Sequence, residues 1–218
     1  MPVFLSVGAL AYLLGSIPFG YILVRMVRGK DIRASGSGNI GATNVARSAP
    51  VLGIATLLLD AAKGWLAVEL ATQVADRAWS QGEEFYANYF PVRALAALVV
   101  IAGHMFPVWL RFRGGKGVAT GAGAFYALAP SVLFPAFGVF AVAVALFRYV
   151  SLGSMLAAAA LPAVYYLRHA PHAEPVVLAS LIAAAMLVIA RHHSNIRRLL
   201  QGKENRLQFT ARTKKTGA

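Results

Sequence analysis

Three polar segments interrupt a largely apolar sequence, and each combines residue types that can bind phosphate. The first segment, residues 31–47, reads DIRASGSGNIGATNVAR. Glycine adopts backbone conformations closed to other residues, so successive N–H groups can converge on an anion. Ser37, Asn39 and Thr43 add neutral hydrogen-bonding groups, and Arg47 adds a planar charged fork suited to phosphate. We interpret the segment as an anion-binding loop; the alternative is an ordinary connector with turn-forming glycines and orienting arginines.

The second segment, residues 103–123, places a lysine among glycines in the sequence GHMFPVWLRFRGGKGVATGAG. Lys116 is flanked by Gly114, Gly115 and Gly117. The spacing does not match a Walker A loop, but backbone donors and an ammonium group can still hold a phosphate together. Gly117 would begin a helix whose N-terminus faces the same anion. Close packing of small residues is the alternative, and it explains the glycines but not Lys116.

The third segment, residues 191–206, follows the last apolar run and reads RHHSNIRRLLQGKENR. His192 and Asn195 are three residues apart, which places them on one helix face. His193 lies about 100° further round, so we expect only one of the two histidines to face a site. Most of the arginines and lysines can be explained by contact with anionic lipid.

The composition excludes a water-soluble protein. The 218 residues are 58% hydrophobic and 13% charged, contain no cysteine and carry a net charge of +13, whereas soluble domains are about 25% charged. The absence of cysteine excludes disulfides and thiolate chemistry. We therefore expect one membrane-embedded domain, residues 1–218, with a flexible basic tail at 205–218.

The hydropathy and charge patterns predict an all-α integral membrane protein. A helix needs about 20 apolar residues to span a bilayer. Runs near or above the lower limit occupy residues 2–24, 51–75, 92–110, 131–147, 149–167 and 175–190, and a shorter stretch occupies 119–129. Most of the 21 Lys and Arg residues lie in or beside the three polar segments. Seven crossings with the N-terminus outside place all of these segments in the cytoplasm, as basic loops require.

Two further polar features lie within the predicted spans. Asp60 and Lys63 are three residues apart and can neutralise each other, which favours a structural ion pair over part of a site. His104 is either a core histidine or part of the pocket wall. The sequence shows no metal-binding motif on the predicted cytoplasmic face, so we expect neither a metal nor a cofactor.

Several motifs together resemble the PlsY family of bacterial membrane acyltransferases. They are GSIPFG at 15–20, GSGNIGATN at 36–44, GHMFP and FRGGKGVAT within 103–120, and HHSNIRRLLQGKE at 192–204. The resemblance implies transfer of an acyl group from acyl-phosphate to the sn-1 hydroxyl of glycerol 3-phosphate, giving lysophosphatidate and phosphate. It also implies seven helices in the bacterial inner membrane, with an active site that faces the cytoplasm. We expect a monomer surrounded by membrane lipid, with no nucleic-acid partner.

The resemblance also assigns site residues. The catalytic group would be Ser37, Arg47, Lys116, His192 and Asn195. The substrate-binding group would be Gly38, Asn39, Gly41, Thr43, Asn44, Gly114, Gly115, Gly117 and Ser154. His192 or a phosphate oxygen of the donor would accept the proton. The alternative function is a transporter of an anionic phosphorylated solute, which should carry more polar residues near the membrane midplane than Asp60 and Lys63.

Overall fold

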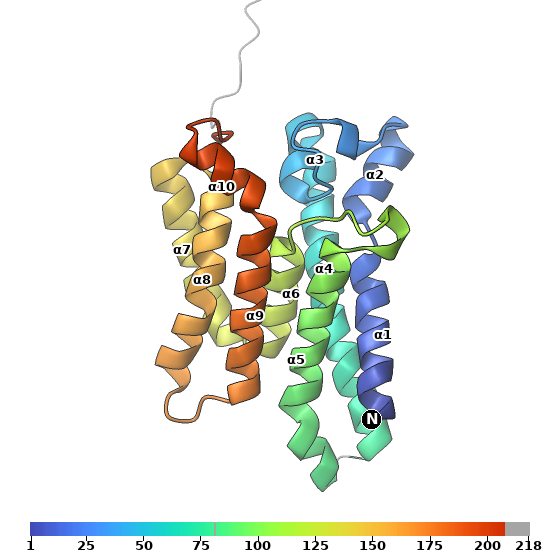
Figure 1. The fold of residues 1–218 in the computed structure, drawn as a ribbon. Coiled ribbons are helices and arrows are strands. Elements are labelled where there is room, and N and C mark those ends of the chain that lie inside the picture. The colour runs from blue at the N-terminus through green and yellow to red at the C-terminus, as the bar shows by residue number, and fades with distance from the viewer. Residues whose placement is uncertain (81, 208–218) are drawn as a thin grey trace, which may run out of the picture.

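The computed structural model describes residues 1–80 and 82–207, which form a bundle of helices without a strand in this part of the chain (Figure 1). The elements are α1 (Pro2–Ser16), α2 (Phe19–Arg28), the 3₁₀ turn η1 (Ile32–Ala34), α3 (Ala42–Ser48), α4 (Pro50–Trp79), α5 (Glu83–Met105), the 3₁₀ turn η2 (Val108–Leu110), α6 (Val118–Leu128), α7 (Pro130–Phe147), α8 (Val150–His169), α9 (Pro175–Arg191) and α10 (His193–Leu200). The prediction of an all-α fold is therefore confirmed for the described residues.

The number of membrane crossings remains a prediction. Among the described residues, five stretches are long and apolar enough to span a bilayer, and α9 with α10 forms a sixth candidate bent by 57°. The stretch predicted as the short fourth span is the separate helix α6. Its 11 residues extend about 17 Å, roughly half the thickness of the hydrocarbon layer.

The first predicted span is interrupted between α1 and α2, although Pro2–Arg28 as a whole is one of the five stretches long and apolar enough to span a bilayer. Ile17 is extended, with φ −64° and ψ 113°. Pro18 has no N–H to continue the helical hydrogen bonds, and it disfavours the helical conformation of the residue before it. The break leaves the carbonyl oxygen of Ile17 free to accept a hydrogen bond from Lys63 Nζ at 2.7 Å.

A buried ion pair ties this break to α4 and α5. Lys63 Nζ lies 2.8 Å from Asp60 Oδ1, with both side chains 3% exposed, which confirms the predicted pairing. Lys63 Nζ also lies 3.1 Å from Nδ1 of His104, which is itself buried. The cluster joins three parts of the bundle just below the polar segments.

Helices α4 and α6 pack with their backbones in close contact. A Cβ atom on Gly64 would lie 2.0 Å from the carbonyl oxygen of Thr120, and one on Gly123 would lie 1.8 Å from that of Ala61. A Cβ on Gly121, by contrast, would lie 3.5 Å from the nearest side-chain atom of Ile101, an ordinary contact. The close approach depends on Gly64 and Gly123, and it holds the start of α6 beside the centre of the bundle.

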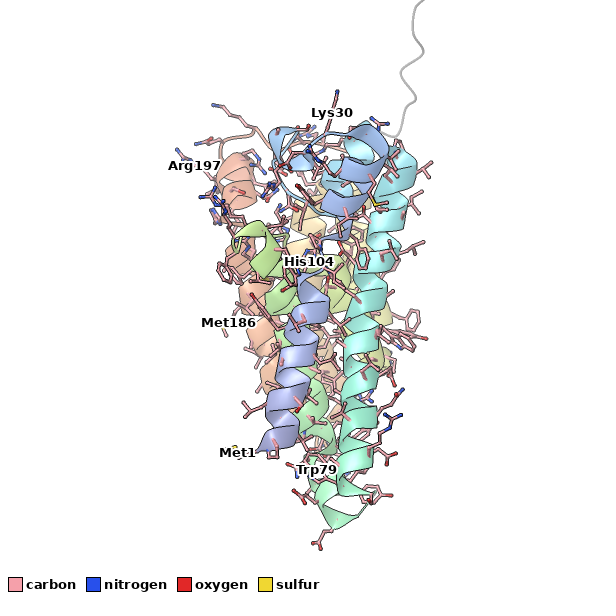
Figure 2. All side chains as sticks on the ribbon, turned by 90° about the vertical axis from the view of Figure 1, so that its right-hand side faces the viewer. Met1, Lys30, Trp79, His104, Met186 and Arg197 are labelled. Carbon is pink, nitrogen blue, oxygen red and sulfur yellow. The ribbon has the colours of Figure 1, made fainter. Side chains whose placement is uncertain are left out.

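The polar segments gather at one end of the bundle. Figure 2 shows Lys30 and Arg197 at one end, Met1 and Trp79 at the opposite end, and His104 between them. Figure 1 shows the loop between α5 and α6 at the same end as α3 and α10. The three segments that the sequence singled out are therefore neighbours in space.

Candidate active site

A hollow of about 1310 Å³ opens at this polar end, and all three segments line it. Its floor includes Ile17 and Pro18 at the break between α1 and α2. The first segment contributes Ser37, Gly38 and Asn39, the second contributes residues 109–114 and Lys116, and the third contributes Arg191, His193, Ser194 and Arg198. Residues from all three polar segments therefore share one hollow.

The first segment is folded around the side chain of Asn44. Its Nδ2 donates to the carbonyl oxygens of Ser35 at 3.0 Å and Asn39 at 2.8 Å, and its Oδ1 accepts from the N–H of Ser37 at 2.9 Å. Gly36 has φ +59°, and a Cβ there would lie 2.3 Å from Asn44 Oδ1. Asn44 is buried, and these hydrogen bonds all go to the loop itself. The substrate contact that the resemblance implies for Asn44 stays a prediction.

The remaining predicted residues of this segment lie around the start and end of α3. The N–H of Gly41 donates to Asn39 Oδ1 at 2.8 Å, and Gly41 caps the helix. Thr43 is exposed in the first turn and Arg47 is exposed in the last turn. Neither lines the hollow directly, but the charge of Arg47 acts on Lys116.

The glycines before Lys116 do not form the predicted anion nest. The N–H of Gly114 donates to the carbonyl oxygen of Met105 at 3.1 Å, and that of Gly115 donates to His104 at 3.0 Å. Their own carbonyl oxygens accept from the guanidinium of Arg191, at 3.2 Å from its Nη2. The expectation that these amides hold phosphate is therefore wrong here, because they fix the loop and orient Arg191 instead.

Lys116 extends from this loop and donates a hydrogen bond to Asn195 Oδ1. Burial lowers the pKa of Lys116 to about 8, although the carboxylate of Glu204 partly opposes the shift. Repulsion by nearby guanidinium groups lowers the pKa further; these belong to Arg198, Arg47 and Arg191. Gly117, with φ +78°, caps the N-terminus of α6 directly after the lysine.

His192 and Asn195 do not share one continuous helix, because His192 occupies the bend between α9 and α10. Its Nδ1 lies 2.7 Å from the carbonyl oxygen of Val188, so Nδ1 carries the proton and Nε2 can accept one. Burial and the neighbouring Lys116 ammonium lower the pKa of His192 to about 4. His192 is buried, whereas His193 is exposed and lines the hollow.

The sequence interpretation left Glu204 out of the site. Glu204 is buried and accepts hydrogen bonds from Asn195 Nδ2 at 2.7 Å, Arg198 Nε at 2.7 Å and Ser151 Oγ at 3.1 Å. Despite burial, the hydrogen bonds from Arg198 and Asn195 keep the pKa of Glu204 below its usual range. A signal was present, since Glu204 is the one acidic residue after position 190.

The predicted Ser154 contacts its own helix instead of Glu204. Its hydroxyl donates to the carbonyl oxygen of Val150 at 2.8 Å, and Ser151, one turn earlier, reaches the carboxylate.

The first residues of the predicted flexible tail are hydrogen-bonded to the loop between α7 and α8. The N–H of Leu207 donates to the carbonyl oxygen of Arg148 at 2.7 Å, and Arg206 Nε donates to the hydroxyl of Tyr149 at 3.0 Å. Positions 208–218 lie outside the described residues.

Known proteins resemble this chain over nearly its whole length. The family model for glycerol-3-phosphate acyltransferase matches residues 5–202. The relative of that name from Syntrophotalea carbinolica is 48% identical over 199 residues, covering 91% of this chain and 94% of the relative. The one from Trichlorobacter lovleyi is 45% identical, with the same coverage.

Two crystal structures of PlsY, described as an integral membrane glycerol 3-phosphate acyltransferase, share the fold. The glycerol 3-phosphate form has a TM-score of 0.81 and 35% identity, covering 94% of this chain and 96% of that one. The lysophosphatidic acid form has a TM-score of 0.77 and 34% identity, covering 94% and 95%. This chain is therefore an acyltransferase of the integral membrane type, and it belongs to the PlsY family of glycerol-3-phosphate acyltransferases.

Proposed function

We propose that this enzyme transfers an acyl group from acyl-phosphate to the sn-1 hydroxyl of glycerol 3-phosphate, the first step of phospholipid synthesis. The products are lysophosphatidate and inorganic phosphate. The names of the relatives support glycerol 3-phosphate as the acceptor. The two PlsY structures, in glycerol 3-phosphate and lysophosphatidic acid forms, support this acceptor and the acylated product.

The charge of the hollow is the observation that supports the proposal most strongly. Both proposed substrates carry phosphate, and the residues lining the hollow include Arg33, Lys116, Arg191 and Arg198. Asp31 is the one acidic residue among those lining it, and its carboxylate pairs with Arg33 at 2.7 Å. A hollow with this excess of positive charge attracts and holds two phosphorylated molecules.

We assign Lys116 and Arg47 to the phosphate of glycerol 3-phosphate, with Ser37, His192 and Asn195 around its hydroxyl groups. Gly38, Asn39, Gly41, Thr43, Gly117 and Ser154 belong in this proposal to the side that receives the acyl-phosphate head. Asn44, Gly114 and Gly115 act indirectly, by holding the loops in shape. No residue is required to carry the acyl group, because the mixed anhydride of the donor is already activated.

The proposed reaction is one displacement at the carbonyl carbon. The sn-1 oxygen of glycerol 3-phosphate attacks that carbon, an ester bond forms, and the bond between the carbon and the phosphate oxygen breaks. Phosphate leaves with the electron pair, and the hydroxyl proton passes to His192 Nε2 or to a donor phosphate oxygen. Holding the two reactants in contact can lower the barrier by up to about 7–11 kcal/mol.

The proposed setting is the bacterial inner membrane, with a monomeric enzyme whose N-terminus lies outside and whose hollow opens to the cytoplasm. The concentration of Lys and Arg at the end of the bundle that carries the hollow supports this orientation, because basic loops stay in the cytoplasm. An acyl donor with a long apolar acyl chain can then reach the hollow from the inner leaflet. Glycerol 3-phosphate reaches it from the aqueous side.

The test is a direct assay of the purified enzyme with palmitoyl-phosphate and glycerol 3-phosphate. Release of phosphate together with lysophosphatidate is expected, and palmitoyl-CoA should not replace the donor. Lys116→Ala should abolish most of the activity, whereas Lys30→Ala, which removes an exposed lysine outside the hollow, should retain it. Transfer from palmitoyl-CoA alone, or uptake of glycerol 3-phosphate into vesicles without product, would overturn the proposal.

A further inference from the structure

The loop between α5 and α6 carries several exposed aromatic and basic side chains. This strap, residues 106–113, reads FPVWLRFR. Trp109 is 63% exposed and Phe112 is 58% exposed, and Arg111 and Arg113 are exposed beside them. Figure 1 shows the strap running outward from the top of α5 before the chain returns to α6.

The strap is held in this shape from within. Leu110 is buried in a small cluster with Val24 of α2 and with Ile32, Ile40 and Val45 of the first polar segment. The N–H of Phe112 donates to the carbonyl oxygen of Pro107 at 3.0 Å, and that of Arg113 donates to Leu110 at 3.2 Å. Arg111 and Phe112 are consecutive non-glycine residues with φ values of 53° and 62°, an uncommon conformation. This backbone conformation turns the aromatic and basic side chains outward together.

The depth of the strap follows from the helix before it. Helix α5 has 23 residues and begins at Glu83 and Glu84, two charged groups that belong outside hydrocarbon. Its length is about 34 Å, slightly more than the hydrocarbon thickness of about 30 Å. An α5 that crosses the bilayer along its normal, with Glu83 outside the hydrocarbon, would bring the start of the strap to the level of the lipid headgroups.

The residue types of the strap are those favoured at the level of the lipid headgroups. Tryptophan is favoured at membrane interfaces, because its ring is mostly apolar while its N–H prefers a polar partner. Arginine side chains extend to the headgroups, where the guanidinium pairs with lipid phosphate. The strap contains two arginines and no acidic residue, so its charge complements an anionic membrane surface.

We propose that the strap is a membrane-contact surface that binds anionic phospholipid. Trp109 and Phe112 lie among the upper parts of the acyl chains, and Arg111 and Arg113 contact the phosphates above them. Trp109, Phe112 and both arginines also line the hollow. For the proposed acyl transfer, on which this consequence depends, the strap holds the opening of the hollow at the height where a phosphorylated lipid presents its head.

The three tryptophans of the chain provide the test, independent of enzyme activity. Trp65→Phe/Trp79→Phe leaves Trp109 as the reporter, and Trp79→Phe/Trp109→Phe leaves Trp65, which is 43% exposed near the middle of α4. Each variant is reconstituted in phosphatidylcholine vesicles, with or without phosphatidylglycerol. Trp109 should be quenched by lipid brominated near the headgroup, and more strongly when phosphatidylglycerol carries the bromine than when the same fraction of phosphatidylcholine does, while Trp65 should respond to deeply brominated lipid.

The arginines are tested in the same background. Arg111→Gln/Arg113→Gln in the Trp109 reporter should remove the added quenching in phosphatidylglycerol and keep the shallow quenching in phosphatidylcholine. The same pair in the Trp65 reporter should leave deep quenching unchanged, which shows that the variant is still inserted. Quenching of Trp109 by aqueous acrylamide but not by brominated lipid would overturn the proposal. Equal quenching of Trp109 with and without phosphatidylglycerol, in the variant that keeps both arginines, would also overturn it.

Discussion

Lys116 and Asn195 join the loop before α6 to α10 through a direct hydrogen bond between residues 79 positions apart. The orientation of the Asn195 amide is fixed, because its Nδ2 donates to Glu204 and only Oδ1 remains for the lysine. The ammonium is therefore connected to a buried carboxylate through one neutral side chain. This arrangement places a positive group in the hollow without pairing it directly to an anion that would compete with phosphate.

Asn195 and Lys116 should behave as one unit in a double-mutant cycle. Asn195→Ala and Lys116→Ala should each lower kcat/KM for glycerol 3-phosphate, by roughly 10²–10³ fold for the lysine. The double variant should be little worse than Lys116→Ala alone, since residues in contact show coupling energies of about 0.5–3 kcal/mol.

Asn88→Ala, at the other end of α5, is the control for this cycle and should leave kcat/KM unchanged. Its side chain donates to the carbonyl oxygen of Glu84 at 2.9 Å on an exposed surface. If the losses of the two single variants simply add, the observed hydrogen bond does not organise the site.

The acceptor-binding step should weaken at alkaline pH. With a pKa of about 8, Lys116 loses its charge in the free enzyme as the pH rises through that value, so kcat/KM for glycerol 3-phosphate should fall above it. A bound phosphate dianion favours the ammonium, so the fall in kcat should occur at higher pH. Steady-state profiles between pH 6.5 and 10 test both expectations.

Lys116→Arg separates this effect from other ionisations. An arginine stays charged throughout the range, so the alkaline fall in kcat/KM should disappear even if the less suitable geometry lowers the plateau. An unchanged alkaline fall in Lys116→Arg would assign the ionisation to another group.

The carboxylate of Glu204 should be detectable in the same profile. Its charge raises the pKa of Lys116 against the effect of burial, so Glu204→Gln should move the alkaline fall in kcat/KM to lower pH. The variant should also be less stable to heat, because Arg198 loses its charged partner. Glu83→Gln removes an exposed carboxylate at the far end of the bundle. It should change neither the pH of the alkaline fall in kcat/KM nor the stability to heat. Coincident profiles for Glu204→Gln and the parent would contradict the proposed coupling.

Two glycines with left-handed backbones offer a matched comparison. Gly29 and Gly36 have φ values of +64° and +59°, but a Cβ on Gly29 meets open space whereas one on Gly36 meets Asn44 Oδ1. Both substitutions to alanine should cost about 1 kcal/mol in backbone strain. Only Gly36→Ala should also disturb the loop and reduce activity strongly, as Asn44→Ala should. Equal activity in Gly29→Ala and Gly36→Ala would show that the loop does not depend on this contact.

The class of fold and the grouping of the polar segments could be predicted from the sequence, because hydropathy and charge are summed over many residues. The break at Ile17 was not predicted, although Pro18 marks it, because the apolar run continues on both sides. The span count was less accessible, since the length of α6 alone does not decide whether it crosses the membrane.

The motifs identified the right segments but not the partners of each side chain. The glycines beside Lys116 were expected to bind an anion, yet their N–H groups pair with the end of α5, and a spacing rule cannot reveal which carbonyl is near. Glu204 was overlooked because a lone acid in a basic tail has no periodic signature. Its role depends on Ser151 and Asn195, which are 53 and 9 residues away.

The buried pair of Asp60 and Lys63 should stabilise the fold only as a pair. Lys63→Met leaves a carboxylate with 3% of its side chain exposed and only His104 Nδ1, 3.5 Å away, beside it. The change should cost on the order of 3 kcal/mol, because the buried charge loses its lysine partner. Asp60→Asn/Lys63→Met removes both charges and should recover part of the loss. Recovery should be incomplete, since the carbonyl oxygen of Ile17 loses its hydrogen bond from Lys63 and keeps only the N–H of Phe19, at 3.2 Å. Thermal unfolding in detergent measures the series, and a double variant less stable than Lys63→Met would mean that the pair acts through something other than charge compensation.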